Sequence, residues 1–213
     1  MHRRHLLASA LLPALLTASR AWAQSGFQPN AQEKAELARI QTYLDSVRTL
    51  KARFLQVASN GSIARGTAWI ERPGRMRFQY DPPTPYLLVA GHGLLVFHDS
   101  ELNQTSNIPL GRTPLGILLA EHVHLSGDVT VTGMQHLPGQ IQVTLVRTGS
   151  PGEGSLTLVF AENPLSLRQW TVTDAQRQET RVTLYDVQLG GSFDPGLFEY
   201  VAPMVPQTEG GAG

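Results

Sequence analysis

The sequence predicts a mainly β protein in which one long antiparallel sheet carries only two helices. About ten short segments alternate polar and apolar residues at roughly ten-residue spacing, which is typical of successive antiparallel strands. Only two segments have the periodicity of a helix. A meander of this kind forms a sandwich or an open barrel, and the concave face of a curled sheet must be filled by side chains, by a lid or by a guest.

Length and composition are those of one globular domain. The chain has 213 residues, of which 41% are hydrophobic, and its formal net charge is +0. That length allows a sizeable core, and the balanced charge without a Lys/Arg stripe argues against nucleic-acid binding. The sequence has no cysteine, so the chain can form neither a disulfide nor a thiol-linked lipid anchor.

The first 23 residues have the three parts of a cleaved export signal. A basic start, MHRRH, precedes the apolar run LLASALLPALLTAS, and the small-x-small site AWA follows. The run is shorter than a membrane span, which needs about 20 apolar residues. We therefore expect a signal peptide over residues 1–23, a mature domain over 24–205 that begins at Gln24, and a mobile tail over 206–213. The arginine pair in MHRRH resembles a twin-arginine signal, so Sec and twin-arginine export both stay open.

A helix is predicted directly after this leader. Asn30, with Glu33 three residues later, forms a helix-capping pair. The segment AQEKAELARIQTYLDSV places its apolar residues on one stripe and its charged residues elsewhere, over about four turns. The stripe consists of Leu37, Ile40, Leu44 and Val47.

From residues 52–57 onward the periodicity changes to two. Met76, Phe78 and Tyr80 alternate with polar residues in RMRFQY, which predicts a strand with one apolar face. The turn GHG at 91–93 predicts a hairpin between two such runs. Further strands are expected in GTAWIE, YLLVA, LLVFHD, DVTVT, QIQVTLV, SLTLVF, LRQWTVTD and ETRVTLYDVQL.

The second helical segment is GRTPLGILLAEH. We expect Thr113 to cap this helix and Pro114 to be its first residue, because the fixed φ of proline suits that position. The residues that follow make a short helix that is apolar on more than one side. They are Leu115, Ile117, Leu118 and Leu119.

Motifs for catalysis are missing from the sequence. It contains no G-x-S-x-G elbow, no glycine-rich phosphate loop, no H-E-x-x-H and no calcium loop. His98, Asp99 and Ser100 have the residue types of a triad, but a triad is assembled from distant segments and these three are contiguous. The carboxylates in or beside the later strands are ordinary there, and we expect no enzyme. They are Asp174, Glu179 and Asp186.

His122 and His124 are the one pair that could begin a metal site. With a spacing of two residues they would share one face of an extended strand. A metal site needs three or four ligands, and no further cluster is evident. We therefore expect an exposed strand end here and no bound metal.

The order of these motifs resembles the LolA family, the soluble periplasmic carriers of lipoproteins. The most diagnostic block runs from Gly66 to Gln104, with G-x-x-W-I-x-R-P-G, a polar–apolar alternation, a proline pair and a G-x-G hairpin. SVRTLKARFLQ precedes it, and TPLGILL and LRQWTVTDAQRQETRVTLYDV follow it. The resemblance covers residues 33–203, nearly the whole mature domain.

The resemblance implies an incomplete (half-open) antiparallel β-barrel with a helical lid over a hydrophobic cavity that holds the acyl chains of a lipoprotein. In the family the arginine of the R-P motif binds the lid and holds it closed, and Arg72 has that position. The residues expected to line the cavity are Met76, Phe78, Tyr80, Trp69 and Phe54. The residues expected on the underside of the lid are Leu37, Ile40, Leu44, Val47, Leu115, Leu118 and Leu119.

Partners and compartment also come from the resemblance. A carrier of this family receives lipoproteins from an inner-membrane ABC transporter, LolCDE, and passes them to LolB, an outer-membrane lipoprotein receptor of similar fold. A LolB-like receptor needs a lipidated cysteine at its mature end, so the absence of cysteine favours the carrier. We expect a monomer in the periplasm that binds acylated lipoproteins and needs no cofactor.

Two departures from the family pattern keep narrower alternatives open. The family often has an apolar residue directly after R-P-x, where this chain has Arg75, and residues 121–153 match only in character. A specialised LolA-like paralogue stays an alternative, as does a periplasmic binding protein for another lipid such as a fatty acid or an isoprenoid. A signalling domain of the same architecture and an unrecognised hydrolase are the remaining rivals.

Overall fold

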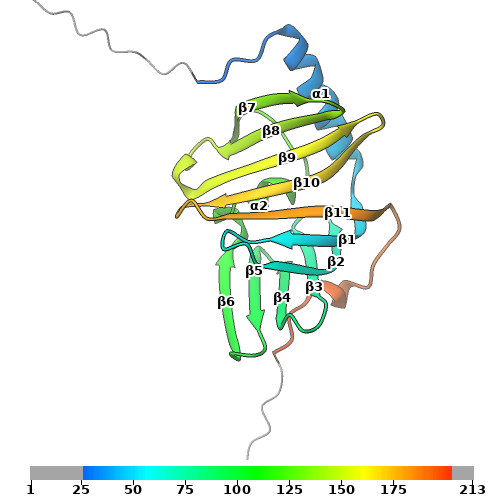
Figure 1. Ribbon diagram of the computed structural model, residues 1–213, viewed down its shortest axis with the longest axis vertical. Helices are drawn as coiled ribbons and strands as arrows, with labels where there is room; N and C mark the ends of the chain where they lie inside the picture. The colour runs from blue at the N-terminus through cyan, green and yellow to red at the C-terminus, as the bar shows by residue number, and fades with distance from the viewer. Residues whose placement is uncertain (1–25, 203–213) are drawn as a thin grey trace, which may run out of the picture.

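The computed structural model describes residues 26–202, whose strands form one 11-stranded antiparallel sheet (Figure 1). The predicted mainly β class is confirmed, and the sheet is not closed into a barrel, because β6 and β7 lie at its opposite borders. The predicted signal peptide (1–23), the mature start at Gln24 and the tail (206–213) fall outside the described residues. The sheet order is β6-β5-β4-β3-β2-β1-β11-β10-β9-β8-β7. The strands are β1 (Thr49–Val57), β2 (Ile63–Glu71), β3 (Arg75–Tyr80), β4 (Tyr86–Gly91), β5 (Leu94–Asp99), β6 (Gln104–Pro109), β7 (Val129–Leu137), β8 (Gln140–Arg147), β9 (Gly154–Glu162), β10 (Leu165–Asp174) and β11 (Glu179–Leu189).

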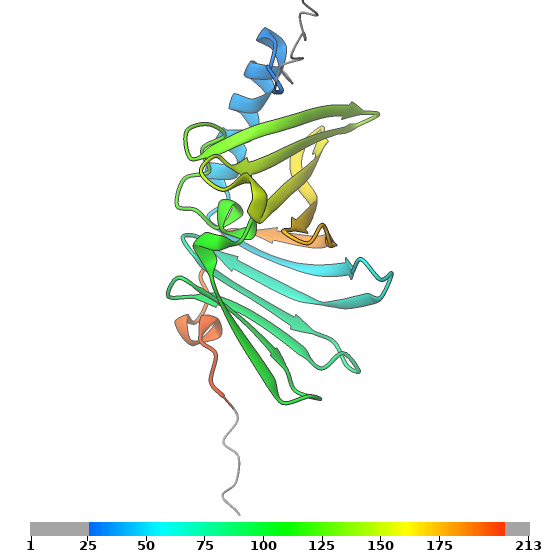
Figure 2. The same cartoon turned by 90° about the vertical axis from the view of Figure 1, so that its left-hand side faces the viewer.

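The sheet is strongly bent. Figure 2 shows a part with β7 to β10 and a part with β1 to β6 that diverge from a common side, where the short helix α2 lies. The register shifts between Lys51 and Arg53 in β1, and between Leu167 and Gln169 in β10. Shifts of this kind are β-bulges, which bend a strand and increase its twist. The concave side of the bent sheet is the side that needs covering.

Every strand except β6 coincides with a predicted segment. QTSNIP in β6 has no polar–apolar alternation, and all six of its residues are exposed. The strand forms by pairing with β5. The predicted hairpin at 91–93 is confirmed. His92 and Gly93 have φ values of 51° and 77°, which suit the two-residue turn of a type I′ hairpin.

The first helix forms as its sequence predicts. α1 (Ala31–Ser46) has 16 residues and begins with the predicted capping box. The Glu33 N–H donates to Asn30 Oδ1 at 2.9 Å, and the Asn30 N–H donates to Glu33 Oε2 at 2.7 Å. These two bonds satisfy main-chain donors that have no partner within the helix.

The second helix is shorter than the prediction, and its cap differs. α2 (Leu115–Leu118) has four residues, with Pro114 at the N-cap position rather than inside the helix. The helix ends where its next carbonyl bonds elsewhere, since the Gly74 N–H donates to Leu119 O at 2.8 Å. Three 3-10 turns complete the described chain. They are η1 (Leu110–Arg112), η2 (Pro151–Glu153) and η3 (Pro195–Phe198).

One core fills the space between the two parts of the sheet and the helices. The Phe78 ring centroid lies 4.6 Å from that of Phe54 and 5.9 Å from that of Trp170, which joins β3 to both β1 and β10. Aromatic pairs at such distances stabilise a core beyond the area that they bury. The part of the sheet with β7 to β10 contributes side chains that are fully buried, namely Leu145, Leu156, Leu158 and Phe160.

Gly66 in β2 gives a test of how closely β1, β2 and β3 pack. A Cβ at this position would lie 2.2 Å from Gln79 O and 2.7 Å from the Phe54 ring. Gly66→Ala should therefore lower the free energy of unfolding by about 2 kcal/mol, measured by urea unfolding followed by tryptophan fluorescence. Gly133→Ala on β7, where nothing lies within 4 Å, is the control and should change it by less than about 0.5 kcal/mol. Equal effects of the two changes would contradict the close approach.

Candidate functional site

The concave face of β1, β2 and β3 forms an apolar wall. The strand register pairs Ala68 with Phe78 and Ile70 with Met76, so these four side chains share one face. Phe54 and Tyr80 lie on the same face, with ring centroids 5.2 Å apart. Four of the five residues predicted to line a cavity therefore lie together in the core, each at most 8% exposed.

Trp69 is the exception, and its predicted position is corrected by the structure. It pairs with Arg77, and it lies between Ala68 and Ile70, which are both buried on the concave face. Since successive residues of a strand point to opposite faces, Trp69 lies on the convex face. It is half-buried there, and Lys51 Nζ lies 5.8 Å from its ring centroid. The prediction overlooked the alternation within β2.

The C-terminal end of α1 and the helix α2 meet the end of this wall, where Leu44 and Leu118 line one small cavity with Ile70. Leu37, Ile40 and Leu44 of α1 belong to the same core cluster as the wall, and Val47 packs against it half-buried. The cavity left between the helices and the sheet near Leu44 has a volume of only about 20 Å³, barely enough for one water molecule. A guest can enter here only if a helix moves. The residues of α2 and its C-cap in the cluster are Leu115, Ile117, Leu118 and Leu119.

Arg72 joins the two helical segments. Its side chain is buried, Nε donates to Val47 O at 2.8 Å, and Nη2 donates to Val47 O at 2.6 Å and to Leu44 O. Nη1 donates to Ala120 O at 3.4 Å, just after α2. One guanidinium thus holds carbonyls at the C-terminal end of α1, where the helix dipole favours a cation, and a carbonyl next to α2.

The Arg72 guanidinium donates its hydrogen bonds to these carbonyls rather than to a carboxylate. Burial lowers the pKa of Arg72, the nearby positive charge of Arg48 lowers it further, and Asp45 raises it. An arginine stays protonated at neutral pH because its unperturbed pKa is above about 12. Breaking the contact would leave the carbonyls of Leu44 and Val47 without this donor, which is costly for buried groups.

Further polar contacts join α1 to residues 119–125. Asp45 Oδ1 accepts from the Val123 N–H at 3.0 Å, and Gln41 Oε1 accepts from the Leu125 N–H at 3.2 Å. Arg48 Nη1 donates to Glu121 O at 2.8 Å. Sequence reasoning missed these contacts, because Gln41, Asp45 and Arg48 look like ordinary polar residues of a helix surface. They make α1 and the segment after α2 one connected cover.

A groove opens beside this cover, between β4 to β6 and the turn from β10 to β11. Its volume is about 660 Å³, within the range of sites that hold small molecules. Its rim is polar, with Arg112 Nε 3.7 Å from Glu153 Oε1. Sequence reasoning missed the groove as well, because it lies between segments distant in the chain and beside the unpredicted β6. The apolar residues that line it are Leu88, Leu95, Ile108, Pro109, Pro114, Leu115 and Val172.

Comparison with protein families decides the assignment. The family model described as outer membrane lipoprotein carrier protein LolA matches residues 45–201, which include all eleven strands. The chain belongs to the LolA family. The predicted resemblance is thereby confirmed over most of the described residues.

Individual relatives agree with the LolA assignment. The outer-membrane lipoprotein carrier protein of Methylococcus capsulatus is 28% identical and aligns over 84% of this chain and 88% of its own length. Its counterpart in Azotobacter vinelandii is 27% identical over 91% of this chain and 95% of its own length. Among solved structures, a LolA superfamily protein of Nitrosomonas europaea has a TM-score of 0.43 and 8% identity, and the match covers 77% of this chain and 97% of that chain.

LolA proteins are lipoprotein carriers of the periplasm and not enzymes, so the non-enzymatic interpretation is confirmed. Across residues 26–202, none of the helices is long and apolar enough to span a membrane.

His98 and Asp99 do not form a catalytic relay. His98 Nδ1 lies 3.0 Å from Thr105 Oγ1, and Asp99 Oδ1 instead accepts from the Glu101 N–H at 3.0 Å.

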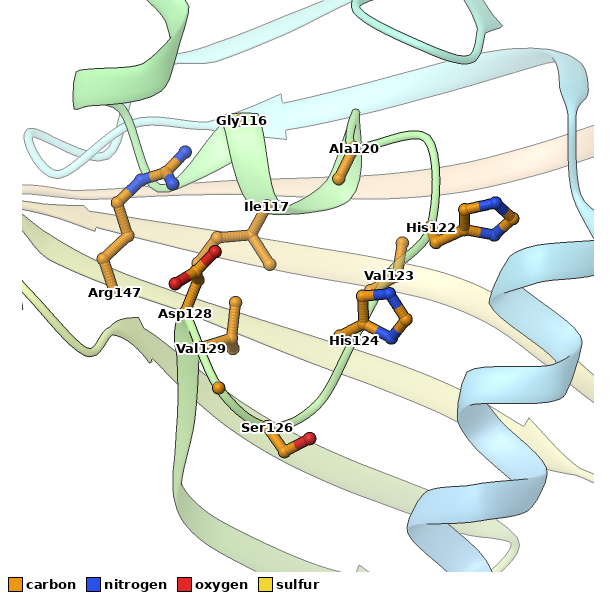
Figure 3. Close-up of a pocket in the computed structure, with 11 residues that line it drawn as sticks. Gly116, Ile117, Ala120, His122, Val123, His124, Ser126, Asp128, Val129 and Arg147 are labelled. Carbon is orange, nitrogen blue, oxygen red and sulfur yellow. The ribbon is translucent and has the colours of Figure 1, made fainter.

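A second, polar pocket lies beside α2 (Figure 3). Its volume is about 450 Å³, and His122, His124, Asp128 and Arg147 contribute its polar side chains. The histidines lie on the loop between α2 and β7, so the expected strand end is wrong, and the loop is positioned by the contacts with α1. Among the described residues no group of three or more His, Cys, Asp or Glu could hold a metal ion.

The titration of Tyr80 tests whether this part of the wall is apolar and dry. Burial raises the pKa of Tyr80 to about 12, and its hydroxyl donates to Gln56 Oε1 at 2.8 Å. Because this value exceeds the ordinary one of about 10, the contribution of neutral Tyr80 to stability is present below pH 10 and is lost as the pH rises through 12.

Ultraviolet absorbance titration should therefore show one late tyrosine, and Tyr80→Phe should remove it. The folded variant should also lose less stability than the original protein as the pH rises above about 10. Tyr185→Phe is the control, because Tyr185 is exposed on β11. Titration of every tyrosine near its ordinary pKa would place Tyr80 in contact with water instead.

Proposed function

We propose that this protein shields the acyl chains of lipoproteins and moves them across the periplasm, from an inner-membrane ABC transporter of the LolCDE type to an outer-membrane receptor of the LolB type. The observation that carries the proposal is the contact of Arg72 with Leu44, Val47 and Ala120, which closes a removable cover over an apolar interior. The interior wall of Phe54, Met76, Phe78 and Tyr80 then serves as the acyl-chain site.

The energetics of the cargo require such a cover. An acyl chain of about 16 carbons left in water costs on the order of 12 kcal/mol, so lipoproteins with two or three chains do not cross an aqueous compartment unaided. A carrier must supply apolar surface comparable to that of a membrane. The adaptable side chain of Met76 suits a wall that repacks around irregular guests.

The same cover keeps binding from becoming irreversible. In the closed state Leu37, Ile40 and Leu44 of α1 are themselves buried, so opening exposes apolar area and costs free energy. Arg72 adds charge-assisted hydrogen bonds of roughly 1.5–3 kcal/mol each to the closed state. Both contributions offset part of the gain from acyl-chain burial, and release to a receptor stays feasible.

A release assay on spheroplasts tests the proposal. Purified protein comprising residues 24–213 is added to cells without their outer membrane, and the supernatant is analysed for lipoproteins. Acylated lipoprotein in a soluble complex with this chain supports a carrier. No release, alongside a working LolA as positive control, would indicate a binding protein for another lipid, which extraction and mass spectrometry of the bound ligand would identify.

Arg72→Leu should weaken the closed state without removing the apolar wall. We expect the variant to take up lipoprotein from spheroplasts but to transfer at least tenfold less to a LolB-containing acceptor, because about 1.4 kcal/mol of lost closing energy already changes the equilibrium tenfold. Arg75→Leu is the matched control, because Arg75 contacts Glu71 and the Phe198 ring, away from the helices. Normal transfer by Arg72→Leu would disprove the role of this residue.

Phe78→Glu should reduce cargo loading. A carboxylate among acyl chains is desolvated without a partner, which strongly disfavours the loaded state. Loading is measured as lipoprotein released from spheroplasts per molecule of protein, with circular dichroism as a check that the variant folds. Gln79→Glu introduces the same group one residue away, on the exposed side of β3, and should load normally. Equal loading by both variants would exclude Phe78 from the acyl-chain site.

A further inference from the structure

The two borders of the sheet differ in how they are protected. β7 has a register shift between Val131 and Gly133, and His136 Nε2 lies 2.6 Å from Glu36 Oε2 of α1. A bulge and a covering helix are two of the devices that keep a sheet edge from pairing with another chain. β6 has no register shift, no charged residue and six exposed residues. Figure 1 shows it at the border of the sheet, and no other strand of the described part of the chain lies beyond it.

The free hydrogen-bonding groups of β6 can be assigned from its pairing with β5. The Leu110 N–H donates to Gly93 O at 2.8 Å, and the register from there to the start of β6 is regular. Because hydrogen-bonded and non-hydrogen-bonded pairs alternate, the N–H and C=O groups of Thr105 and Asn107 point away from β5. Pro109 is the next outward residue, so its missing N–H costs the β5–β6 pairing nothing.

The two faces of β6 adjoin different parts of the molecule. On the concave side the Ile108 side chain lines the groove. On the convex side Thr105 Oγ1 lies 3.1 Å from the Tyr200 hydroxyl, where the chain after η3 crosses β5 and β6. The strand is thus held on its convex side, and its outward main-chain groups lie at the rim of the groove.

We propose that the edge of β6 binds the extended peptide that follows the acylated residue of the cargo lipoprotein, as an added antiparallel or parallel strand. This inference rests on the proposed function. Leu88 lines the groove and pairs with Phe78 of the wall, so acyl chains bound at the wall bring the attached peptide to the rim of the groove. Main-chain hydrogen bonds do not depend on the identity of the side chains, which suits a carrier of lipoproteins with different sequences. The uncharged edge likewise discriminates against neither acidic nor basic peptides.

Two ligands that differ only in the peptide distinguish a failure of this inference from a failure of the proposed function. The first is a triacylated cysteine amide without a peptide, and the second is the same group followed by an eight-residue Gly/Ser peptide. Affinities are measured by displacement of a fluorescent fatty acid from the purified protein. We expect the peptide to increase affinity about tenfold, as two or three net main-chain hydrogen bonds would. Hydrogen exchange of the Thr105 and Asn107 amides should slow with the second ligand only.

Changes in the ligand and in the protein test the pairing itself. N-methylation of alternate peptide residues should abolish the tenfold gain in one register and leave it intact in the other, because only every second N–H faces β6. Thr105→Pro removes an outward N–H and should abolish the gain. Thr105→Val is the matched control: it loses the hydroxyl contact with Tyr200, keeps the N–H, and should keep the gain.

Three results would overturn the inference. Equal affinity of the two ligands, with displacement by both, would leave the acyl-chain site standing and exclude the β6 edge. A concentration-dependent dimer that Thr105→Pro converts to a monomer would show that a second copy of this chain occupies the edge instead. No displacement by either ligand would refute the acyl-chain site, and the inference about β6 with it.

Discussion

The structure depends on one constraint, which is that the concave face of a bent antiparallel sheet is apolar and must be covered. Side chains from the two parts of the sheet fill much of the interior, and the apolar stripe of α1 covers the remainder together with α2. The cover is packed so closely that the cavity beneath it holds about 20 Å³. A well-packed interior of this kind admits no guest by small adjustments, because packed cores do not deform continuously. Any loading must therefore exchange one complete covering for another.

Apolar contacts alone do not define the closed position of such a cover, because Leu37 or Leu118 gains as much from packing against an acyl chain as against Phe78. Polar contacts are directional, so they fix the position of the helices in the closed state. Arg72 reaches carbonyls of α1 and of the segment after α2 from the turn between β2 and β3, and Gln41, Asp45 and Arg48 connect the two segments to each other. The closed state is thus specified by a few hydrogen bonds at one end of the helices, while the bulk of its free energy comes from burial.

Local signals predicted most of the fold and part of the site. Alternation located ten strands and placed Met76, Phe78 and Tyr80 on one face, and Asn30 with Glu33 located the start of α1. The prediction for Trp69 was wrong, because the alternation of β2 places its side chain on the face opposite to Ala68 and Ile70. β6 has no local signal, since it exists only through pairing with β5. The contact between Gln41 and Leu125, 84 residues apart, and the groove beside β6 depend on tertiary packing that no short-range pattern contains.

The open border of the sheet follows from the same constraint. Closing β6 onto β7 would remove both edges and satisfy every main-chain group, as in complete barrels, but it would also fix the interior volume. Here the chain between β6 and β7 crosses the gap as η1, α2 and a loop, so the segment that spans the opening is also part of the cover. Within residues 26–202, β6 thereby keeps an unprotected edge beside the groove. The opening of the cover and the pairing of the β6 edge, which we propose above, have the same origin in this gap.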